Sequence, residues 1–457
     1  MSAFGAKLAL SRAVGAASRA SGRGGGTTLP GRVLLRLQPD AIALLGERLG
    51  RGTTVISATN GKTTTAGMLA AVLAAAGRRP VHNRAGSNMT WGVATALLEQ
   101  QGDEGLFEVD EAWLARVVEQ LDAGVVVLGN LFRDQLDRYG ELESLADDWA
   151  ALVDRRGAGS RWVLNADDPL VADLGRDRAG AAREGVTYFG IDDPSQALDR
   201  LQHAHDAKHC RRCGHAYDYE RAFVGHLGHY RCPNCGAERP RPQVAATRIE
   251  LHGMDGSTAT VRTPAGELDL HLPLPGLYNV YNALAAIAAA LELGAGLEQA
   301  KAGIEPMEAV FGRVETIAVE GKPVSTLLIK NPAGANEVLR TLQLEADDGG
   351  LDLWLALNDR IADGRDVSWI WDADFELLAE SVRSVTCAGT RAPEMALRLK
   401  YAGWPEDRMR VEPRIAESLD AAVADAPERL FALPTYTALI ELRTLLADRG
   451  LAKEYWA

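Results

Sequence analysis

The chain has 457 residues, and because a typical domain has about 150 residues, we expect two or three domains. Its formal net charge is −13, with 47% hydrophobic and 24% charged residues, which is the balance of a soluble globular protein. The overall acidity disfavours a protein that binds nucleic acid through bulk charge. No apolar run approaches the roughly 18 residues that cross a bilayer, and the first residues lack the apolar core of a secretory signal. We therefore expect a cytoplasmic protein.

The beginning of the chain is basic. Residues 1–51 contain eight Lys and Arg against Asp40 and Glu47, a net charge of +6 that leaves −19 for the remainder. Basic residues separated by Ala, Leu and Val are compatible with a helix that lies on an anionic membrane face. A solvated helix that packs on the next domain is the simpler interpretation. The glycines at 22 and 24–26 predict a hinge after it.

Four cysteines have the spacing of a zinc ribbon, in which each C-x-x-C pair presents two thiolates to one tetrahedral ion. Eighteen residues separate the pairs, and Gly214 and Gly236 follow them where the chain must turn sharply. The predicted zinc ligands are Cys210, Cys213, Cys232 and Cys235. Disulfides are the alternative, and nearby histidines could compete as ligands, but four thiolates complete a tetrahedron, so we expect a structural site. Cys387 lies in an apolar run and is predicted to be a buried strand residue.

Residues 53–77 predict a short β-branched strand, a tight turn and an Ala- and Leu-rich helix. The turn at residues 60–64 (N-G-K-T-T) is typical of a loop whose backbone amides bind phosphate at the start of a helix. Lys62 would neutralise the β- and γ-phosphates, and the Thr63 hydroxyl would hold Mg²⁺. The general phosphate-loop pattern has a glycine where this chain has Ile56, so the match to that pattern is incomplete.

Strands and helices alternate downstream, as in a doubly wound parallel α/β sheet. An apolar strand ends in acids at residues 106–111, and Glu108 is the candidate Mg²⁺ ligand facing the phosphate loop, with an exposed strand-end acid as the alternative. Ligands of such sheets bind at the carboxyl ends of strands. The other predicted strands begin the segments 124–130, 162–169, 326–329, 351–357, 384–387 and 429–433, and those after about residue 317 form a second, smaller α/β domain.

These motifs resemble the Mur ligase superfamily, ATP-dependent enzymes that activate a carboxylate as an acyl phosphate and capture it with an amine. The family strings T-G-T-N-G-K-T-T, D-H-L-D, G-x-H-N-x-x-N-x-x-A-A and G-R-x-E appear here at residues 57–64, 134–137, 276–286 and 312–315. Ala58 replaces a glycine, and Gln135 and Tyr278 each replace a histidine. These departures from the family strings speak against the metal geometry of ordinary peptide ligases.

The departures match one branch of the superfamily, the MurT synthetase subunits. That resemblance rests on the four-cysteine group together with the strings at residues 133–138, 330–334 and 358–372. It implies amidation of the α-carboxylate of D-glutamate in the lipid II stem peptide during peptidoglycan synthesis, with ATP and Mg²⁺. Ammonia would come from a separate GatD-like glutaminase subunit in a heterodimer.

The resemblance also assigns roles to single residues. Asn279 and Asn282 would contact adenine, with helix N-capping as the alternative, and Arg313 would bind phosphate or a neighbouring acid. Asp366 would orient the partner's catalytic histidine, with a helix cap or an ion pair to Arg365 as alternatives. The expected catalytic residues are Asp366, Lys62 and Glu108, and the expected ATP-binding residues are Thr59, Asn60, Gly61, Lys62, Thr63, Thr64, Asn279, Asn282 and Arg313.

The residue inventory supports the need for a partner. Release of ammonia from glutamine takes a thiolate with a base beside it, but four cysteines belong to the metal pattern and no histidine follows His271. The chain therefore has no credible glutaminase centre of its own. Trp369 and Trp371 are expected in the core, with a role as interface anchors as the alternative.

The expected organisation is a basic helical segment at 1–50, a central ATP-binding domain at 51–315 with a zinc ribbon inserted at 205–240, and a C-terminal α/β domain at 316–457. The ribbon would stabilise the fold of a long insertion, or would contact the lipid-linked substrate. Two alternative functions are a conventional ligase that adds an amino acid to a peptide or folate, and a zinc-ribbon ATPase that binds nucleic acid. A lipid-linked substrate would give the basic first segment a use at the inner membrane face.

Overall fold

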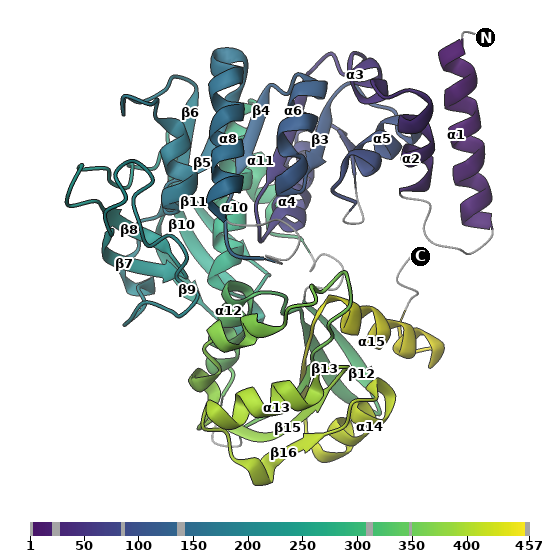
Figure 1. Cartoon of the computed structure of the whole chain (residues 1–457), viewed down its shortest axis with the longest axis vertical. Helices are drawn as coiled ribbons and strands as arrows, with labels where there is room; N and C mark the ends of the chain where they lie inside the picture. Colours follow the sequence, from purple (N-terminus) through teal and green to yellow (C-terminus); the bar gives the residue numbers. More distant parts are fainter. Residues whose placement is uncertain are drawn as a thin grey trace.

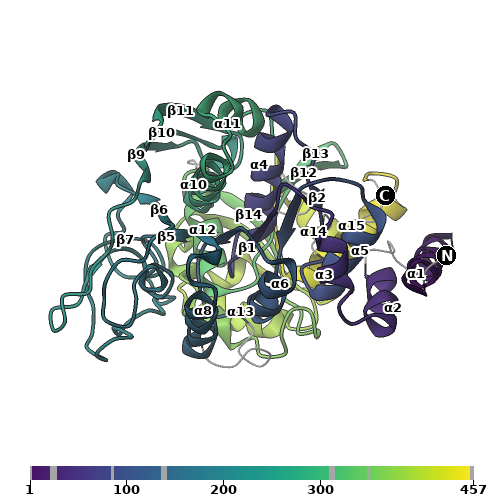
Figure 2. The same cartoon turned by 90° about the horizontal axis from the view of Figure 1, so that it is seen from above.

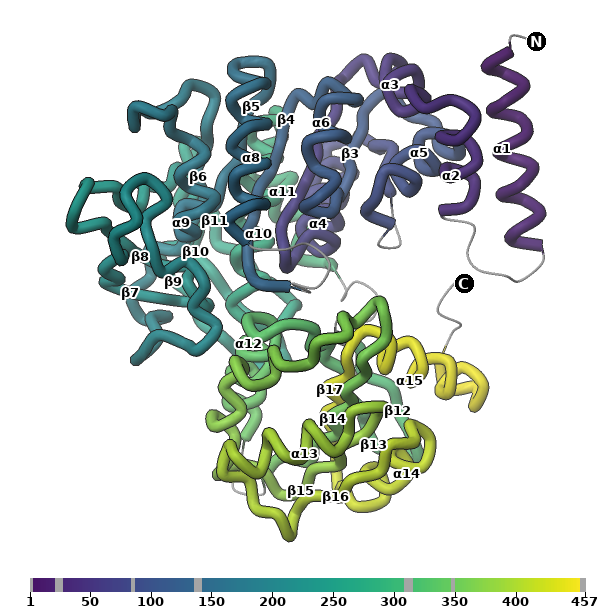
Figure 3. The backbone as a smooth tube through the Cα atoms, in the orientation of Figure 1, coloured from purple at the N-terminus to yellow at the C-terminus, as the bar shows by residue number. Residues whose placement is uncertain are grey.

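The fold is described from a computed structural model that covers residues 3–20, 28–83, 87–134, 142–307, 314–346 and 350–452. It has two α/β bodies, one built on a nine-stranded sheet and one on a six-stranded sheet, which lie one above the other in Figures 1 and 3. In the part of the chain so described, no helix is both long enough and apolar enough to cross a membrane.

The larger sheet has the strand order β11-β10-β9-β6-β5-β4-β1-β3-β2 and is parallel from β2 to β9. Strands β1 and β4 are buried on both faces, as the uninterrupted apolar runs of a covered parallel sheet require. The strands are β1 (Thr53–Ser57), β2 (Val81–His82), β3 (Gly105–Glu108), β4 (Val125–Leu128), β5 (Arg161–Asn165), β6 (Val186–Ile191), β9 (Val244–Leu251), β10 (Ser257–Thr263) and β11 (Gly266–Leu272). The predicted strands of this region are confirmed.

Helices cover both faces of this sheet. One face packs against α4 (Lys62–Ala75), α10 (Leu277–Glu292) and α11 (Leu297–Ile304), and the other against α3 (Ala41–Gly46), α5 (Thr90–Glu99), α6 (Leu114–Leu121) and α8 (Leu142–Arg156). The short helix α9 (Pro169–Ala172) follows β5. Helix α10 is apolar and buried on nearly all sides because it packs on the sheet and against both α4 and α11. A Cβ at Gly303 would lie 2.6 Å from the Val72 amide nitrogen, so the approach of α11 to α4 requires glycine there.

An insertion, defined here as residues 198–243, lies between β6 and β9 and carries the four cysteines. It contains an antiparallel hairpin of β7 (Asp218–Val224) and β8 (Leu227–Arg231). Gly214 and Gly236 both have φ +73°, so the sharp turns predicted after the cysteine pairs are confirmed. The hairpin and the amino-terminal helix lie at opposite ends of the molecule in two views (Figures 1 and 2).

The smaller sheet has the order β12-β13-β17-β14-β15-β16 and is parallel except for the β12–β13 pair. Its strands are β12 (Val314–Val319), β13 (Lys322–Leu327), β14 (Leu351–Ala356), β15 (Val382–Ala388), β16 (Met409–Val411) and β17 (Leu430–Pro434). Helices α12 (Pro332–Gln343) and α13 (Ala392–Tyr401) cover one face, and α14 (Ile415–Asp425) and α15 (Tyr436–Asp448) the other. The predicted second α/β unit is confirmed, and Cys387 is fully buried in β15.

The amino-terminal helix α1 (Ala3–Ala20) packs against α2 (Leu29–Leu37) and α5. The Arg12 guanidinium donates to the Leu98 carbonyl oxygen at 2.9 and 3.1 Å, and Arg19 pairs with Glu99 at 2.8 Å. The predicted packing of this segment on the next domain is therefore confirmed. The glycines at 22 and 24–26, predicted as a hinge, lie outside the described residues.

Candidate functional site

The phosphate loop joins β1 to α4 in a conformation that requires glycine. Gly61 has φ +91°, and a Cβ there would lie 2.0 Å from Asn282 Oδ1, so no other residue fits. Helix α4 begins at the next residue, Lys62, and has no acidic residue in its first turn. The amides at this helix start therefore offer an anion site without a competing carboxylate on the helix itself.

Lys62 is held inside the loop. Its ammonium lies 2.8 Å from Glu111 Oε2 and also donates to the Ala58 carbonyl oxygen. Burial by itself would lower the pKa of Lys62, but Glu111 and Asp110 outweigh burial and raise it. The lysine therefore stays charged, and an incoming phosphate would compete with Glu111 for it.

Glu108 ends β3, which pairs with β1 in the register Ile56 to Glu108. Its backbone is fixed by Asn83, which accepts from the Glu108 amide at 3.0 Å and donates to its carbonyl oxygen at 2.8 Å. The side chain is buried, yet neither carboxylate oxygen has a hydrogen-bond partner. An unpartnered buried carboxylate is costly unless a cation completes it. The carboxylate of Glu108 and the hydroxyl of Thr63 are the hard oxygen donors that Mg²⁺ prefers, so these residues fit the predicted ion.

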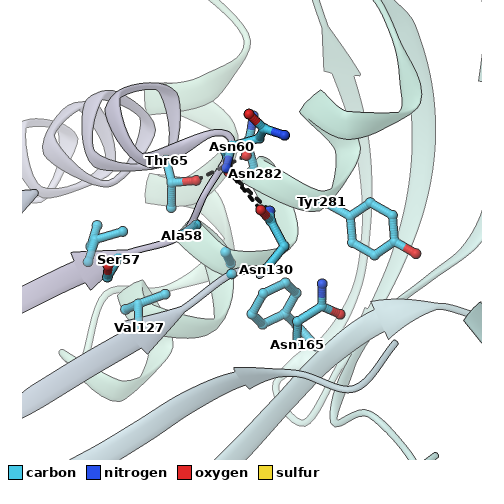
Figure 4. A pocket seen from close by; sticks show the side chains of 13 residues that line it. Ser57, Ala58, Asn60, Thr65, Val127, Asn130, Asn165, Tyr281 and Asn282 are labelled. Carbon is cyan, nitrogen blue, oxygen red and sulfur yellow. Dashed lines mark hydrogen bonds between the residues drawn. The ribbon is translucent and has the colours of Figure 1, made fainter. Parts of the chain in front are cut away.

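A pocket lies beside the loop, between the carboxyl ends of β1, β4 and β5 and the first turns of α10 (Figure 4). Asn130, which follows β4, accepts from the Asn60 amide at 2.9 Å and donates to its carbonyl oxygen at 3.0 Å. Asn165 and Tyr281 also line the pocket. Sequence reasoning did not assign these three residues, although the position of Asn130 at the end of a buried strand was a usable signal.

The two asparagines of α10 have different places. Asn282 lines the pocket and accepts from Thr65 Oγ1 at 3.2 Å. Asn279 lies behind it, accepting from Asn282 Nδ2 at 2.9 Å and donating to the Pro275 carbonyl oxygen at 2.8 Å. The N-cap of α10 is Gly276, so the alternative that these asparagines are N-caps is wrong. In this arrangement Asn279 orients Asn282.

Two residues of the smaller α/β body reach the phosphate loop. Lys330 Nζ lies 2.6 Å from Asp134 Oδ2 and 3.3 Å from the Thr59 carbonyl oxygen. The side-chain amides of Asn331 and Asn60 exchange hydrogen bonds of 3.0 and 3.3 Å. Sequence reasoning used residues 330–334 as a family string but gave them no role at the site. Arg313, Gln135 and Asp137 lie outside the described residues.

Asp366 is exposed on the loop that follows β14. It accepts from the Ser368 amide at 2.8 Å, and this amide and the Ser368 side chain lower the pKa of Asp366. Asp366 thus stays ionised, and its carboxylate bonds the first residue of the 3-10 turn Ser368–Asp372, whose N-cap is Val367. Trp371 in that turn is 47% exposed, so its expected place in the core is wrong. Trp369 is partly buried against the core.

The four cysteines of the insertion converge. Their sulfur atoms all lie within 4.8 Å of one another, and none of the chain's five cysteines forms a disulfide. The disulfide alternative is therefore wrong. No histidine belongs to this group in the described residues. Four sulfur donors at such separations suit a tetrahedral metal ion, for which a metal–sulfur distance of about 2.3 Å places sulfurs about 3.8 Å apart.

Comparisons with known proteins agree with this arrangement. Residues 56–290 match the model of the Mur ligase middle domain, and residues 328–439 that of the MurT ligase C-terminal domain. The chain is 31% identical over 439 residues to the MurT subunit of lipid II isoglutaminyl synthase (glutamine-hydrolysing) from Streptococcus pneumoniae, covering 94% of both chains. It is 33% identical over 428 residues to the subunit of the same name from Staphylococcus aureus, covering 93% of both.

Solved structures share the fold. A pseudomurein peptide ligase type C from Methanothermus fervidus has a TM-score of 0.69 at 22% identity, with 89% of this chain and 80% of that chain covered. MurF from Acinetobacter baumannii has a TM-score of 0.64 at 19% identity, with 91% and 80% covered.

Proposed function

The chain belongs to the MurT family of Mur ligases, and from that premise we propose that it is the ATP-dependent synthetase subunit of a lipid II isoglutaminyl synthase. It amidates the α-carboxylate of D-glutamate in the stem peptide to D-isoglutamine. The observation that carries the ATP-dependent chemistry is the unpartnered, buried carboxylate of Glu108 beside the phosphate loop. Full-length similarity to MurT subunits supports the choice of substrate.

The residues in and beside the phosphate loop have different roles in phosphoryl transfer. The loop amides and Lys62 hold the β- and γ-phosphates of ATP, with Thr59, Asn60, Gly61 and Thr64 shaping the loop. Glu108 and Thr63 would hold Mg²⁺, which would neutralise charge on the transferring phosphoryl group. The substrate carboxylate takes the γ-phosphoryl group and becomes an acyl phosphate. Ammonia then attacks the acyl carbon, and inorganic phosphate leaves.

The nucleotide base would lie in the pocket beside the loop. Asn282 and Asn130 offer amide donors and acceptors there, as the edge of adenine requires. Asn279 holds Asn282 from behind. Arg313, in the connection to the C-terminal domain, completes the proposed phosphate contacts.

Ammonia would come from a GatD-like glutaminase subunit. Burial raises the pKa of Cys387 to about 12, so this thiol is not a nucleophile at neutral pH. The ionised, exposed carboxylate of Asp366 is suited to orient the partner's catalytic histidine, because a carboxylate fixes the imidazole tautomer and stabilises its charged form. The exposed indole of Trp371, 5.8 Å from the Tyr401 ring, supports a docking surface beside it.

We further propose that the four cysteines bind zinc and that the chain divides into a basic segment at 1–50, a central domain at 51–315 with the ribbon at 205–240, and a C-terminal domain at 316–457. The apolar outer side of α1, where Leu10 is 53% exposed, and the exposed Arg32 and Arg36 of α2 support peripheral contact with an anionic membrane. Deletion of residues 1–25 should then lower activity on vesicle-embedded lipid II but not on detergent-solubilised lipid II. Equal activity on both would leave the segment as packing alone.

The proposal is tested by mass spectrometry of lipid II incubated with ATP and the purified chain. We expect amidation with ammonium chloride by the chain alone, and with glutamine only when a GatD-like subunit is present. Amidation from glutamine by the chain alone would contradict the two-subunit proposal. Addition of an amino acid instead of ammonia would favour the conventional ligase, and stimulation of ATP hydrolysis by DNA would favour the nucleic-acid ATPase.

A further inference from the structure

We propose that the insertion is a brace between the two α/β bodies, with His203 as a positioning residue that holds α12 so that Lys330 and Asn331 reach the phosphate loop. The insertion, residues 198–243, has its hairpin on the same side of the molecule as α12 (Figure 1). Its effect on turnover rests on the function proposed above. Its effect on the mobility of α12 does not.

The first contact joins the insertion to a rigid part of the C-terminal domain. His203 Nδ1 lies 2.6 Å from Oδ1 of Asp374, which is 5% exposed. The other Asp374 oxygen accepts from Asn336 Nδ2 at 2.8 Å, and the Asp374 amide donates to Asn336 Oδ1 at 2.7 Å. Asn336 is fully buried on α12. The histidine therefore acts on the helix through Asp374 and not on a loose loop.

The second contact reaches the same face of α12. Arg340 Nη1 donates to the Phe223 carbonyl oxygen of β7 at 2.7 Å and is held by Glu337 at 2.9 Å. Asn336 and Arg340 are four residues apart, and such residues lie above one another on one side of a helix. The insertion thus contacts α12 directly at residue 223, and residue 203 reaches the same side of the helix through Asp374.

A third contact links the insertion to the site itself. The Arg133 amide donates to Asp206 Oδ2 at 3.0 Å, and its guanidinium bonds Asp206 and lies 3.2 Å from Asp372 Oδ2. The next residue, Asp134, is the partner of Lys330. The insertion, the loop after β4 and the C-terminal domain therefore meet at Arg133, directly beside the cation that faces the phosphate loop.

These contacts matter because of how the C-terminal domain is attached. The chain passes from the larger sheet to the smaller once, between α11 and β12. Domains joined by one connection move relative to each other by default. At its start, α12 is capped by Asn331, which also bonds Asn60 of the phosphate loop. The insertion holds that helix at Asn336 and Arg340, so the brace keeps Lys330 at the phosphate loop.

The test compares His203→Ala, His203→Asn and the control His271→Ala in the complete two-subunit complex. Because the His203 side chain is 63% exposed, its truncation leaves the core intact, and Asn places an amide where Nδ1 donates. We expect His203→Ala to speed amide hydrogen exchange of residues 332–343 by roughly fivefold while α13 to α15 stay unchanged. We expect the KM for ATP to rise by about tenfold in ammonium-driven amidation, with a smaller loss of kcat. Asn should restore both.

Three outcomes would overturn the brace: no change in exchange of α12, a uniform increase across the C-terminal domain, or the same change in His271→Ala. His271 lies on β11, the edge strand of the larger sheet, with an exposed side chain. Arg340→Ala supplies a second variant of the brace and should act in the same direction. Hydrogen exchange can be measured without turnover. If the wild-type complex did not amidate lipid II, the proposed function would be refuted, and the exchange of α12 would still show whether the brace exists.

Discussion

In both sheets, polar residues lie at or after the carboxyl ends of the parallel strands, and we call this side of each sheet its strand-end edge. The polar residues of the two strand-end edges have different partners. At the edge of the larger sheet the carboxylate of Glu108 is buried without a partner. At the edge of the smaller sheet the Asp363 carboxylate accepts from the Thr437 amide at 2.7 Å and from its hydroxyl, and Asn358 donates to the same hydroxyl at 3.0 Å. The strand-end edge of the larger sheet therefore has a carboxylate available to a ligand, and we call it the open edge. At the strand-end edge of the smaller sheet the Asp363 carboxylate is bonded to a neighbouring loop, and we call it the closed edge.

This difference shows that equivalent positions of two similar sheets do not imply equivalent function. The smaller sheet sends Lys330 and Asn331 to the larger one and exposes Asp366. Near the same strand ends, Asp363 bonds Thr437 and Asp359 bonds Thr390 and Arg391, all within the smaller body. Substitutions on the two edges should therefore separate chemistry, ammonia supply and stability.

The largest effect is expected from Lys62→Ala at the open edge. The ammonium is the buried cation of the phosphate loop, and loss of one preorganised charge-stabilising group costs about 10²–10³-fold in turnover. Phosphate release with lipid II and ammonium chloride should fall by at least this factor. Lys400→Ala, which removes an exposed ammonium paired with Glu406, is the control. Unchanged turnover in Lys62→Ala would remove this residue from the site.

Glu108→Gln should be nearly as damaging, and its signature is a changed need for Mg²⁺. The backbone bonds to Asn83 remain, so the strand is preserved while the charge is lost. The Mg²⁺ concentration for half-maximal turnover should rise by more than the ~10–100-fold that loss of an outer metal partner costs. Asn83→Ala keeps the carboxylate and should change this concentration less. An unchanged Mg²⁺ dependence in Glu108→Gln would show that this carboxylate does not hold the ion.

Asp366→Asn should separate the two nitrogen sources. We expect glutamine-driven amidation by the complex to fall by up to ~10⁴-fold, the cost of losing the carboxylate that orients a catalytic histidine. Ammonium-driven amidation should be unchanged. Asp359→Asn, which replaces an acid of the same loop that bonds Thr390 and Arg391, is the matched control. Equal losses with both nitrogen sources would place Asp366 in the synthetase site instead.

Cys232→Ser should release zinc and loosen the insertion, because thiolate ligands and local folding are coupled. The metal content measured by mass spectrometry should fall. Ammonium-driven turnover should fall by about tenfold, because the loosened insertion no longer holds the smaller body in place against the phosphate loop. Cys387→Ala removes a buried thiol outside the group and should keep the metal. Retained metal in Cys232→Ser would point to neighbouring histidines as ligands.

The sequence was sufficient for features that local rules determine. The strand, turn and helix around Gly61, the alternation of elements, the cysteine group and the burial of Cys387 follow from periodicity, turn chemistry and spacing. Glu108 was predicted because it ends an apolar strand at the place where a Mg²⁺ ligand would face the phosphate loop. Its lack of a partner depends on every neighbour and could not be predicted.

Features that depend on tertiary contact were missed or wrong. Lys330 and Asn331 meet Thr59 and Asn60 across 271 residues of sequence, and no local pattern encodes that pairing. Trp371 was expected in the core because tryptophan is apolar, but its place in a surface turn leaves it exposed. An apolar side chain favours burial, but it does not determine which side of a short turn faces the core.

The smallest effect is expected from Asp363→Asn at the closed edge. Burial raises the pKa of Asp363 despite its bonds to Thr437. A raised pKa in the folded state means that its contribution to stability is present below the unfolded pKa and is lost as pH rises through the folded pKa. Asn cannot ionise and keeps an acceptor for the Thr437 amide. Relative to wild type, the variant should therefore gain stability between pH 4 and pH 7, with a net change within about 1 kcal/mol.

Urea unfolding at both pH values, followed through the buried Trp354 and Trp404 of the smaller body, measures this difference. Asp359→Asn is again the control, because hydrogen bonds from Thr390 and Arg391 lower the pKa of Asp359 and its removal should give the opposite pH trend. Ammonium-driven turnover of Asp363→Asn should match wild type, since no step of the reaction uses this carboxylate. A tenfold loss of turnover without a loss of stability would show that the closed edge takes part in the chemistry, and the contrast between the two sheets would fail.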